Sequence, residues 1–130
     1  GGTTTLSISD INEISKRIVT ATTTEATILT FSSAIGAGTY IAANVRYMRF
    51  TNLDDTNHIT LTFKDEDNTE FRVKVDAGQS FIYNADSSGG FVDTMKAAGS
   101  ALASGLADLY DVTVDADTAS CDLEIFIASA

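Results

Sequence analysis

The stretch that decides the fold spans residues 45–84 and reads VRYMRFTNLDDTNHITLTFKDEDNTEFRVKVDAGQSFIYN. Apolar and polar residues alternate in short runs, and turns rich in Asp and Asn separate the runs. Alternation with period two is typical of strands that bury one face and leave the other in water. Residues 59–64 and 70–75 therefore predict an antiparallel hairpin whose turn lies at residues 65–68.

Some apolar residues in these runs fall on the phase opposite to the expected core face. In residues 45–51 we expect Val45 and Tyr47 on one face, which leaves Met48 and Phe50 on the other. Ile82 is out of phase with Phe81 in the same way. Apolar residues on both phases indicate a strand buried on both sides or a face that contacts a partner.

The C-terminal residues repeat the alternation. Residues 121–127 place Phe126 out of phase with Leu123 and Ile125, and residues 109–114 read as the neighbouring strand. Residues 91–106 contain two glycines in a small-residue stretch, which predicts a long loop with one helical turn near residues 92–97.

The N-terminal third carries weaker signals. Ser9 and Asp10 with Glu13 fit the start of a brief helix over residues 11–16. Residues 18–24 and 26–32 read as two strands, followed by a glycine-bearing loop at residues 34–38.

These signals together predict an all-β fold. About eight short strands with turn residues between them are typical of an antiparallel β-sandwich or a jelly roll. We expect one domain over residues 1–130, which is a common domain length, with residues 1–9 as an N-terminal arm.

Composition and charge exclude several classes of function. The chain has 130 residues, with 18 acidic and 8 basic side chains and a net charge of -10. A phosphate-backbone binder needs a basic surface, so nucleic acid and anionic lipid are poor partners. No apolar run is long enough to span a bilayer. One Cys excludes an internal disulfide and a Cys-rich zinc site.

Catalytic candidates are few. His58 is the only imidazole and is expected on the solvent side of its strand, while Cys121 is expected on the buried face. Nucleophilic catalysis needs a nucleophile beside an oriented base, and no such arrangement is indicated. We therefore expect no enzyme activity and no cofactor, and a hydrolase depending on His58 is the least favoured alternative.

Acidic turns offer oxygen ligands for calcium, although none has the spacing of an EF-hand loop. Asp and Asn also populate tight turns for conformational reasons, which is the simpler interpretation. Calcium would require turns from separate hairpins to converge at one end of the sandwich. The weak candidate ligands are Asp54, Asp55, Asp65, Asp67, Asp115 and Asp117.

Three segments and the C-terminus carry a resemblance to a known class of proteins. Residues 45–53, 59–63 and 77–84, and the ending at residues 119–128, resemble small virion proteins of tailed marine bacteriophages. The resemblance implies a structural protein of the particle, either a capsid decoration (cement) protein or a tail or fibre component. Such cement proteins are typically β-rich trimers on the capsid exterior that lock neighbouring capsomers together.

The leading hypothesis is thus a capsid decoration protein, made in the host cytoplasm, that binds the major capsid protein and copies of itself as a homotrimer. The alternative is a receptor- or glycan-binding module of a tail fibre, with the loops at residues 54–57 and 65–68 together at one end. The expected contact residues are Thr3, Thr4, Thr5, Leu6, Ile8, Met48, Phe50, Ile82 and Phe126.

Overall fold

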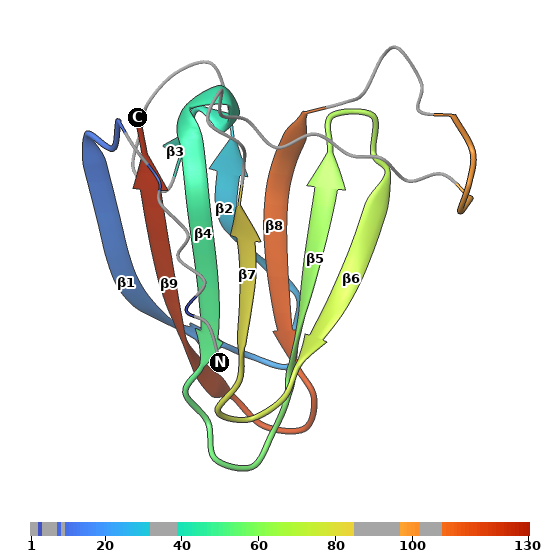
Figure 1. Cartoon of the computed structure of the whole chain (residues 1–130). Coiled ribbons are helices and arrows are strands. Elements are labelled where there is room, and N and C mark those ends of the chain that lie inside the picture. The colour runs from blue at the N-terminus through green and yellow to red at the C-terminus, as the bar shows by residue number, and fades with distance from the viewer. Residues whose placement is uncertain (1–2, 4–7, 9, 32–38, 85–96, 102–107) are drawn as a thin grey trace.

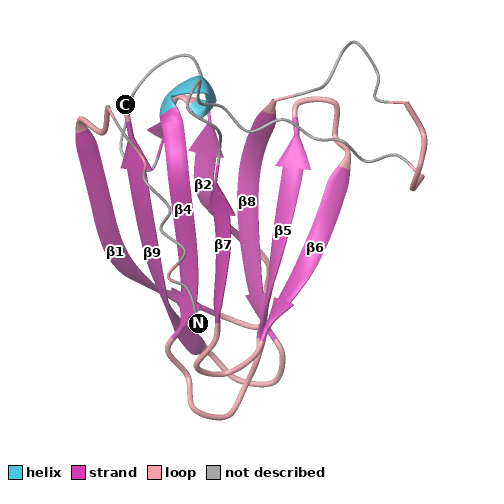
Figure 2. Cartoon of the chain, viewed as in Figure 1, coloured by secondary structure: helices cyan, strands magenta, loops and turns pink. Residues whose placement is uncertain are grey.

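The computed structural model describes residues 3, 8, 10–31, 39–84, 97–101 and 108–130, and nearly all of its elements are strands (Figures 1 and 2). Most of the predicted arm at residues 1–9, the loop at 91–106 and the glycine loop at 34–38 lies outside these residues. In the described part of the chain no helix is long and apolar enough to cross a membrane. The elements are β1 Glu13–Ala21, β2 Ala26–Phe31, β3 Thr39–Tyr40, the 3-10 helix η1 Ala42–Asn44, β4 Val45–Asn52, β5 Ile59–Asp65, β6 Glu70–Val75, β7 Ser80–Asn84, β8 Leu109–Ala116 and β9 Cys121–Ser129.

Two sheets pack face to face, as the sequence predicts. One has the strand order β1-β9-β4-β7 and the other the order β3-β2-β8-β5-β6. The chain crosses between the sheets after β1, β3, β4, β6, β7 and β8, whereas β5 and β6 form the predicted hairpin in one sheet. Repeated crossing of this kind is the connectivity of a jelly roll, a form of β-sandwich.

The core lies between the two sheets and is densest around Phe63. Its ring stacks on Phe71 at 4.9 Å between centroids and meets Tyr83 at 5.4 Å, Phe81 at 5.5 Å and Phe50 at 5.7 Å. These rings come from both sheets, so the cluster joins the two layers. Aromatic pairs at such separations add to the free energy that burial alone supplies.

The predicted helix over residues 11–16 is wrong, because β1 runs through Glu13–Ala21 as one strand. All nine residues of β1 pair with β9, from Glu13 opposite Ser129 to Ala21 opposite Cys121. The prediction rests on Asp10 and Glu13, which have the spacing of a capping box. Pairing along a whole strand outweighs that weak local preference.

The phase predicted for β4 is also wrong. Val45 is buried as expected, but Met48, Phe50 and Asn52 are buried as well, and Tyr47 lies on the outer side. The register with β9 shifts between Val45 and Tyr47. A bulge inserts one extra residue, which reverses the inward and outward positions that follow it.

Candidate interaction surface

The outer face of the β1-β9-β4-β7 sheet combines apolar and charged side chains in rows across four strands. The strand register aligns Lys16, Phe126, Arg49 and Ile82 in one row, since neighbouring members of this row are paired residues. The rows on either side follow from the same register. We call this surface the isoleucine face, and its paired members are Ile14, Lys16, Ile18, Thr20, Tyr47, Arg49, Thr51, Ser80, Ile82, Asp122, Glu124, Phe126 and Ala128.

Three large apolar side chains of this face remain open to water. Ile14 is 63% exposed, Ile18 61% and Ile82 50%. Phe126, between β1 and β4, is half-buried and meets the Tyr47 ring edge-on at 6.0 Å. Scattered single exposed residues are ordinary on protein surfaces, whereas several on one flat sheet mark a contact region.

The charges on the isoleucine face compensate one another. Glu124 lies between two cations, 3.7 Å from the amine of Lys16 and 3.5 Å from the guanidinium of Arg49. The guanidinium also lies 5.1 Å from the centroid of the Phe126 ring, within cation–π range. A partner covering this face would meet charges that already have counter-ions.

The outer face of the other sheet has a different character. Its β5 row carries Thr60, Thr62 and Lys64, which pair with polar residues of β6 and β8. Arg72 bonds to Thr62 at 3.2 Å and to Asp115 at 3.2 Å. This face therefore carries hydroxyls and ion pairs in place of exposed aliphatic side chains.

The structure divides the expected contact residues into four groups. Ile82 and Phe126 lie on the isoleucine face, as the off-phase alternation predicts. Met48 and Phe50 are fully buried, so their assignment to a contact surface is wrong, and the β4 bulge is the reason. In the arm, Thr3 is exposed and Ile8 half-buried. The remaining candidates, Thr4, Thr5 and Leu6, lie outside the described residues.

Sequence reasoning missed Ile14 and Ile18, which are the most exposed large apolar residues in the described part of the chain. Residues 11–16 were expected to be helical, and Ile18 was expected to begin the next strand. A single strand through residues 13–21 would have placed Ile14, Lys16 and Ile18 on one side.

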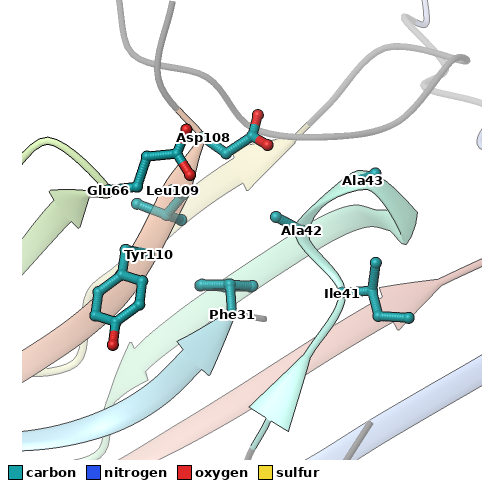
Figure 3. A pocket seen from close by; sticks show the side chains of 8 residues that line it. All are labelled: Phe31, Ile41, Ala42, Ala43, Glu66, Asp108, Leu109 and Tyr110. Atoms are coloured by element: carbon teal, nitrogen blue, oxygen red, sulfur yellow. The ribbon is translucent and has the colours of Figure 1, made fainter. Parts of the chain in front are cut away.

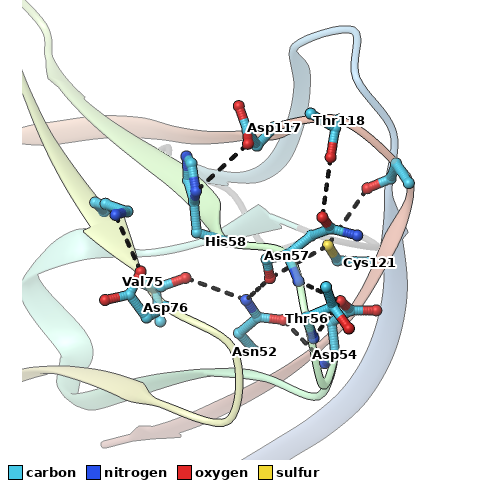
Figure 4. Close-up of polar contacts among 12 residues, drawn as sticks. Asn52, Asp54, Thr56, Asn57, His58, Val75, Asp76, Asp117, Thr118 and Cys121 are labelled. Atoms are coloured by element: carbon cyan, nitrogen blue, oxygen red, sulfur yellow. Dashed lines mark hydrogen bonds and ion pairs between the residues drawn. The ribbon is translucent and has the colours of Figure 1, made fainter.

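A network of hydrogen bonds around buried Asn52 joins three loops at one end of the sandwich (Figure 4). The Nδ2 group of Asn52 donates to the carbonyl of Asn57 at 2.9 Å and to that of Val75 at 3.1 Å. Its Oδ1 accepts the backbone N–H of Asp54 at 3.0 Å. The hydroxyl of Thr118 donates to Oδ1 of Asn57 at 2.9 Å, which ties in the β8–β9 turn. This network is structural, since every contact holds a loop in place.

Most of the calcium candidates already have protein partners. Oδ2 of Asp54 accepts the N–H of Asn57 at 2.6 Å and that of Thr56 at 3.0 Å, and these bonds lower the pKa of its carboxyl. Asp65 is buried and accepts the N–H groups of Asp67 and Thr69 at 2.9 and 2.7 Å. Both carboxylates accept hydrogen bonds within their own turns. This agrees with the interpretation that Asp and Asn occupy these turns for conformational reasons.

Three of the other acidic candidates contact side chains. Oδ1 of Asp55 accepts the hydroxyl of Thr56 at 2.9 Å, Asp115 pairs with Arg72, and Asp117 lies 3.7 Å from Nδ1 of His58. Among the residues that the structure describes, no three His, Cys, Asp or Glu side chains are grouped so that they could hold a metal ion.

The two acidic loops that the fibre hypothesis required at one end lie at opposite ends. The loop at residues 54–57 precedes β5 and the turn at residues 65–68 follows it, so the full length of the strand separates them (Figure 1). That expectation is wrong, because it overlooked that one strand joins the two loops.

His58 and Cys121 lie near the loops that the Asn52 network joins. Sγ of Cys121 lies 3.4 Å from the carbonyl of Ala119 and 3.7 Å from that of Asn57. Burial raises the pKa of the thiol, and the nearby carboxylates of Asp54, Asp122 and Asp117 add to the effect. A raised pKa disfavours the thiolate, which is the reactive form.

A pocket of about 300 Å³ lies at the end of the sandwich opposite the Asn52 network (Figure 3). Its apolar lining includes Phe31, Ala42 and Leu109, and the carboxylates of Glu66 and Asp108 lie on its loop side. This volume is at the lower limit of ordinary ligand pockets. Ile41, Ala43 and Tyr110 complete the lining.

Comparisons with known proteins give a sparse result. No protein-family model and no curated protein matches the chain. Among solved structures, a subunit of Bacillus endospore appendages, described as a family of disulfide-linked pili, superposes with a TM-score of 0.48. The two chains are 16% identical, and the match covers 98% of each. At this score the likeness says nothing about what the chain does.

Proposed function

We propose that the chain is a non-catalytic structural subunit that works by adhering to neighbouring protein chains. The observation that carries the proposal is the isoleucine face, where Ile14, Ile18 and Ile82 expose most or half of their side-chain surface on one sheet. The opposite outer face is polar, so the exposed isoleucines of the described residues all lie on one sheet.

The energetic argument is the hydrophobic effect. Covering exposed aliphatic surface yields about 25 cal/mol per Å² removed from water, or roughly 1 kcal/mol or more for each half-exposed isoleucine. The ion pairs of Glu124 with Lys16 and Arg49 supply the polar contacts typical of interfaces. Repetition by symmetry in an assembly would add many such modest contacts together.

The finer form of the proposal is a decoration protein on the exterior of a virus capsid, in contact with the major capsid protein and with its own copies. It is supported by the resemblance of residues 45–53 and 77–84 to small virion proteins. A component of a tail or fibre is the alternative, and it draws on the same resemblance.

The test is co-sedimentation of the purified chain with empty capsids of a tailed phage, beside light scattering on the chain alone. The proposal expects binding to capsids that saturates and that is weakened when Ile14 and Ile18 are replaced by Thr. A chain that stays monomeric at millimolar concentration and sediments with no capsid would overturn it.

A further inference from the structure

We propose that the isoleucine face pairs with the same face of a second copy, so that the chain forms a two-fold dimer of stacked sheets. The inference rests on the proposed function, and it commits the face to one partner. Contacts with any larger assembly would then use the polar face or the ends, and variants of the isoleucine face would weaken capsid binding by separating the paired copies. A two-fold contact gives a dimer and not the trimer that the resemblance implies.

Charge placement favours a second copy at this face. The paired positions of the isoleucine face carry two cations, Lys16 and Arg49, and two anions, Asp122 and Glu124. Their charges cancel, so the net charge of -10 is carried by the rest of the chain. Copies that meet here therefore bring no net charge together at this surface.

The two ends of the sandwich repel copies. Residues 65–67 with Asp108 place four acids at one end, and Asp54, Asp55, Asp76 and Asp117 place four at the other. The described turns at both ends contain no Lys or Arg. End-to-end contact would bring these like charges together, whereas face-to-face contact leaves them in water.

The register suggests how the two faces fit. A two-fold axis parallel to the strands, between β9 and β4, sets β1 of one copy over β7 of the other. Ile82 lies in the row of Lys16, midway between the rows of Ile14 and Ile18. In the dimer each Ile82 would therefore lie over the aliphatic stem of Lys16 on the opposing β1, flanked by Ile14 and Ile18, a contact made twice.

The area of the isoleucine face limits the affinity of the dimer. Four strands about 4.8 Å apart and seven residues at about 3.3 Å give a patch of roughly 20 by 23 Å on each copy. Two such patches bury about 900 Å² or somewhat more, close to the lower limit for a specific interface. We therefore expect a reversible dimer whose population rises with concentration.

The first experiment measures dimerisation by sedimentation equilibrium. The double variant Ile18→Thr with Ile82→Thr keeps β-branched side chains and should raise the dimer Kd about tenfold or more. The control is Tyr110→Thr, an exposed apolar residue of β8 in the other sheet, which should leave the Kd unchanged. Dimerisation should also strengthen between about 50 and 500 mM NaCl, because salt screens the repulsion between the acidic ends.

The second experiment tests the arrangement with a short bismaleimide cross-linker. Lys16→Cys with Ile82→Cys should give covalent dimers in high yield, while either single variant should give few. Within one chain these positions are three strands apart, about 14 Å, which a short linker does not reach. Efficient dimers from Lys16→Cys alone would instead mean that β1 covers β1, and would overturn the proposed axis.

The outcomes separate this inference from the proposed function. A wild-type chain that is monomeric at millimolar concentration in high salt, yet sediments with capsids, would overturn self-pairing and leave the structural role standing. A dimer whose Kd responds equally to the face variant and the control would also overturn it. A face-dependent dimer that binds no capsid would support self-pairing and contradict the decoration proposal.

Discussion

Asn52 is the residue on which one end of the sandwich depends. Replacing it with Ala removes two donors and one acceptor, and it leaves the carbonyls of Asn57 and Val75 without that partner in a buried site. We expect Asn52→Ala to lower the free energy of unfolding by about 2–4 kcal/mol, measured by urea denaturation. Thr51→Ala, next to it, removes an exposed bond to Ser80 and should cost less than about 1 kcal/mol. Similar losses in both variants would contradict the structural role of Asn52.

Two carboxyls should give opposite pH dependences of stability. The N–H groups of Asn57 and Thr56 lower the pKa of Asp54 from 3.8, so its contribution is present above that value and is lost as the pH falls through the folded-state pKa. Burial raises the pKa of Asp111 from 3.8, with Glu25 and Glu70 adding to the rise and Lys64 opposing it. The contribution of Asp111 is therefore complete only below 3.8 and is lost as the pH rises through its folded-state pKa.

Asp54→Asn and Asp111→Asn form the matched pair that tests these signs. At pH 7 the first variant should be less stable than the wild type, and the second more stable, because it removes a partly buried charge. Both stability differences should shrink as the pH is lowered toward 3. The difference for Asp111→Asn should shrink at a higher pH than the difference for Asp54→Asn. Thermal unfolding across this range measures them, and differences of the same sign at pH 7 would refute the interpretation.

At the scale of elements, the sequence predicts strands well where each strand buries one face and exposes the other. Residues 59–64, 70–75 and 121–127 alternate cleanly, and they appear as β5, β6 and β9. β1 was missed because its outward side holds two isoleucines and its inward side holds Ser15 and Arg17. The side chain of Arg17 donates to the carbonyl of Ile28 across the gap between the sheets. Only pairing with β9, whose residues lie 100 or more positions away in sequence, decides which side of β1 faces in. The local pattern contains no information about that pairing.

The same limit applies to the candidate surface. Ile82 and Phe126 were identified from alternation within their own strands, which is local information. Ile14 and Ile18 join them only through the β1–β9 register. A bulge is equally hard to read from sequence, because no Gly or Pro marks the one between Val45 and Tyr47.

The bulge in β4 makes a prediction of its own. Beyond it the inward residues are Met48 and Phe50, so Phe50→Ala should cost about 3–5 kcal/mol of folding free energy through the cavity that it leaves. Tyr47→Ala, on the outer face, should cost clearly less. The alternation without a bulge predicts the reverse order, so denaturant midpoints of the two variants decide between the two phases.

At the scale of the whole molecule, charge and apolar surface are separated. Both outer sheet faces contain ion pairs, since on the second sheet Lys64 pairs with Glu70 and Arg72 with Asp115, while Lys74 pairs with Asp76 at the end of β6. The acids in excess gather in the turns at the two ends, where they repel one another within each end. This repulsion opposes folding because the unfolded chain spreads the same charges apart.

Screening should therefore stabilise the monomer. At protein concentrations low enough to exclude dimers, raising NaCl from about 20 to 500 mM should raise the melting temperature. Asp55→Asn with Glu66→Gln removes one charge from each end and should reduce the salt response, with an effect on stability of about 1 kcal/mol or less. Lys64→Gln breaks the ion pair with Glu70 on a sheet face. This variant should show a rise in melting temperature with salt that is at least as large as that of the wild type. A melting temperature that falls with salt would mean that the ion pairs on the faces, and not the acidic ends, dominate the electrostatics of the fold.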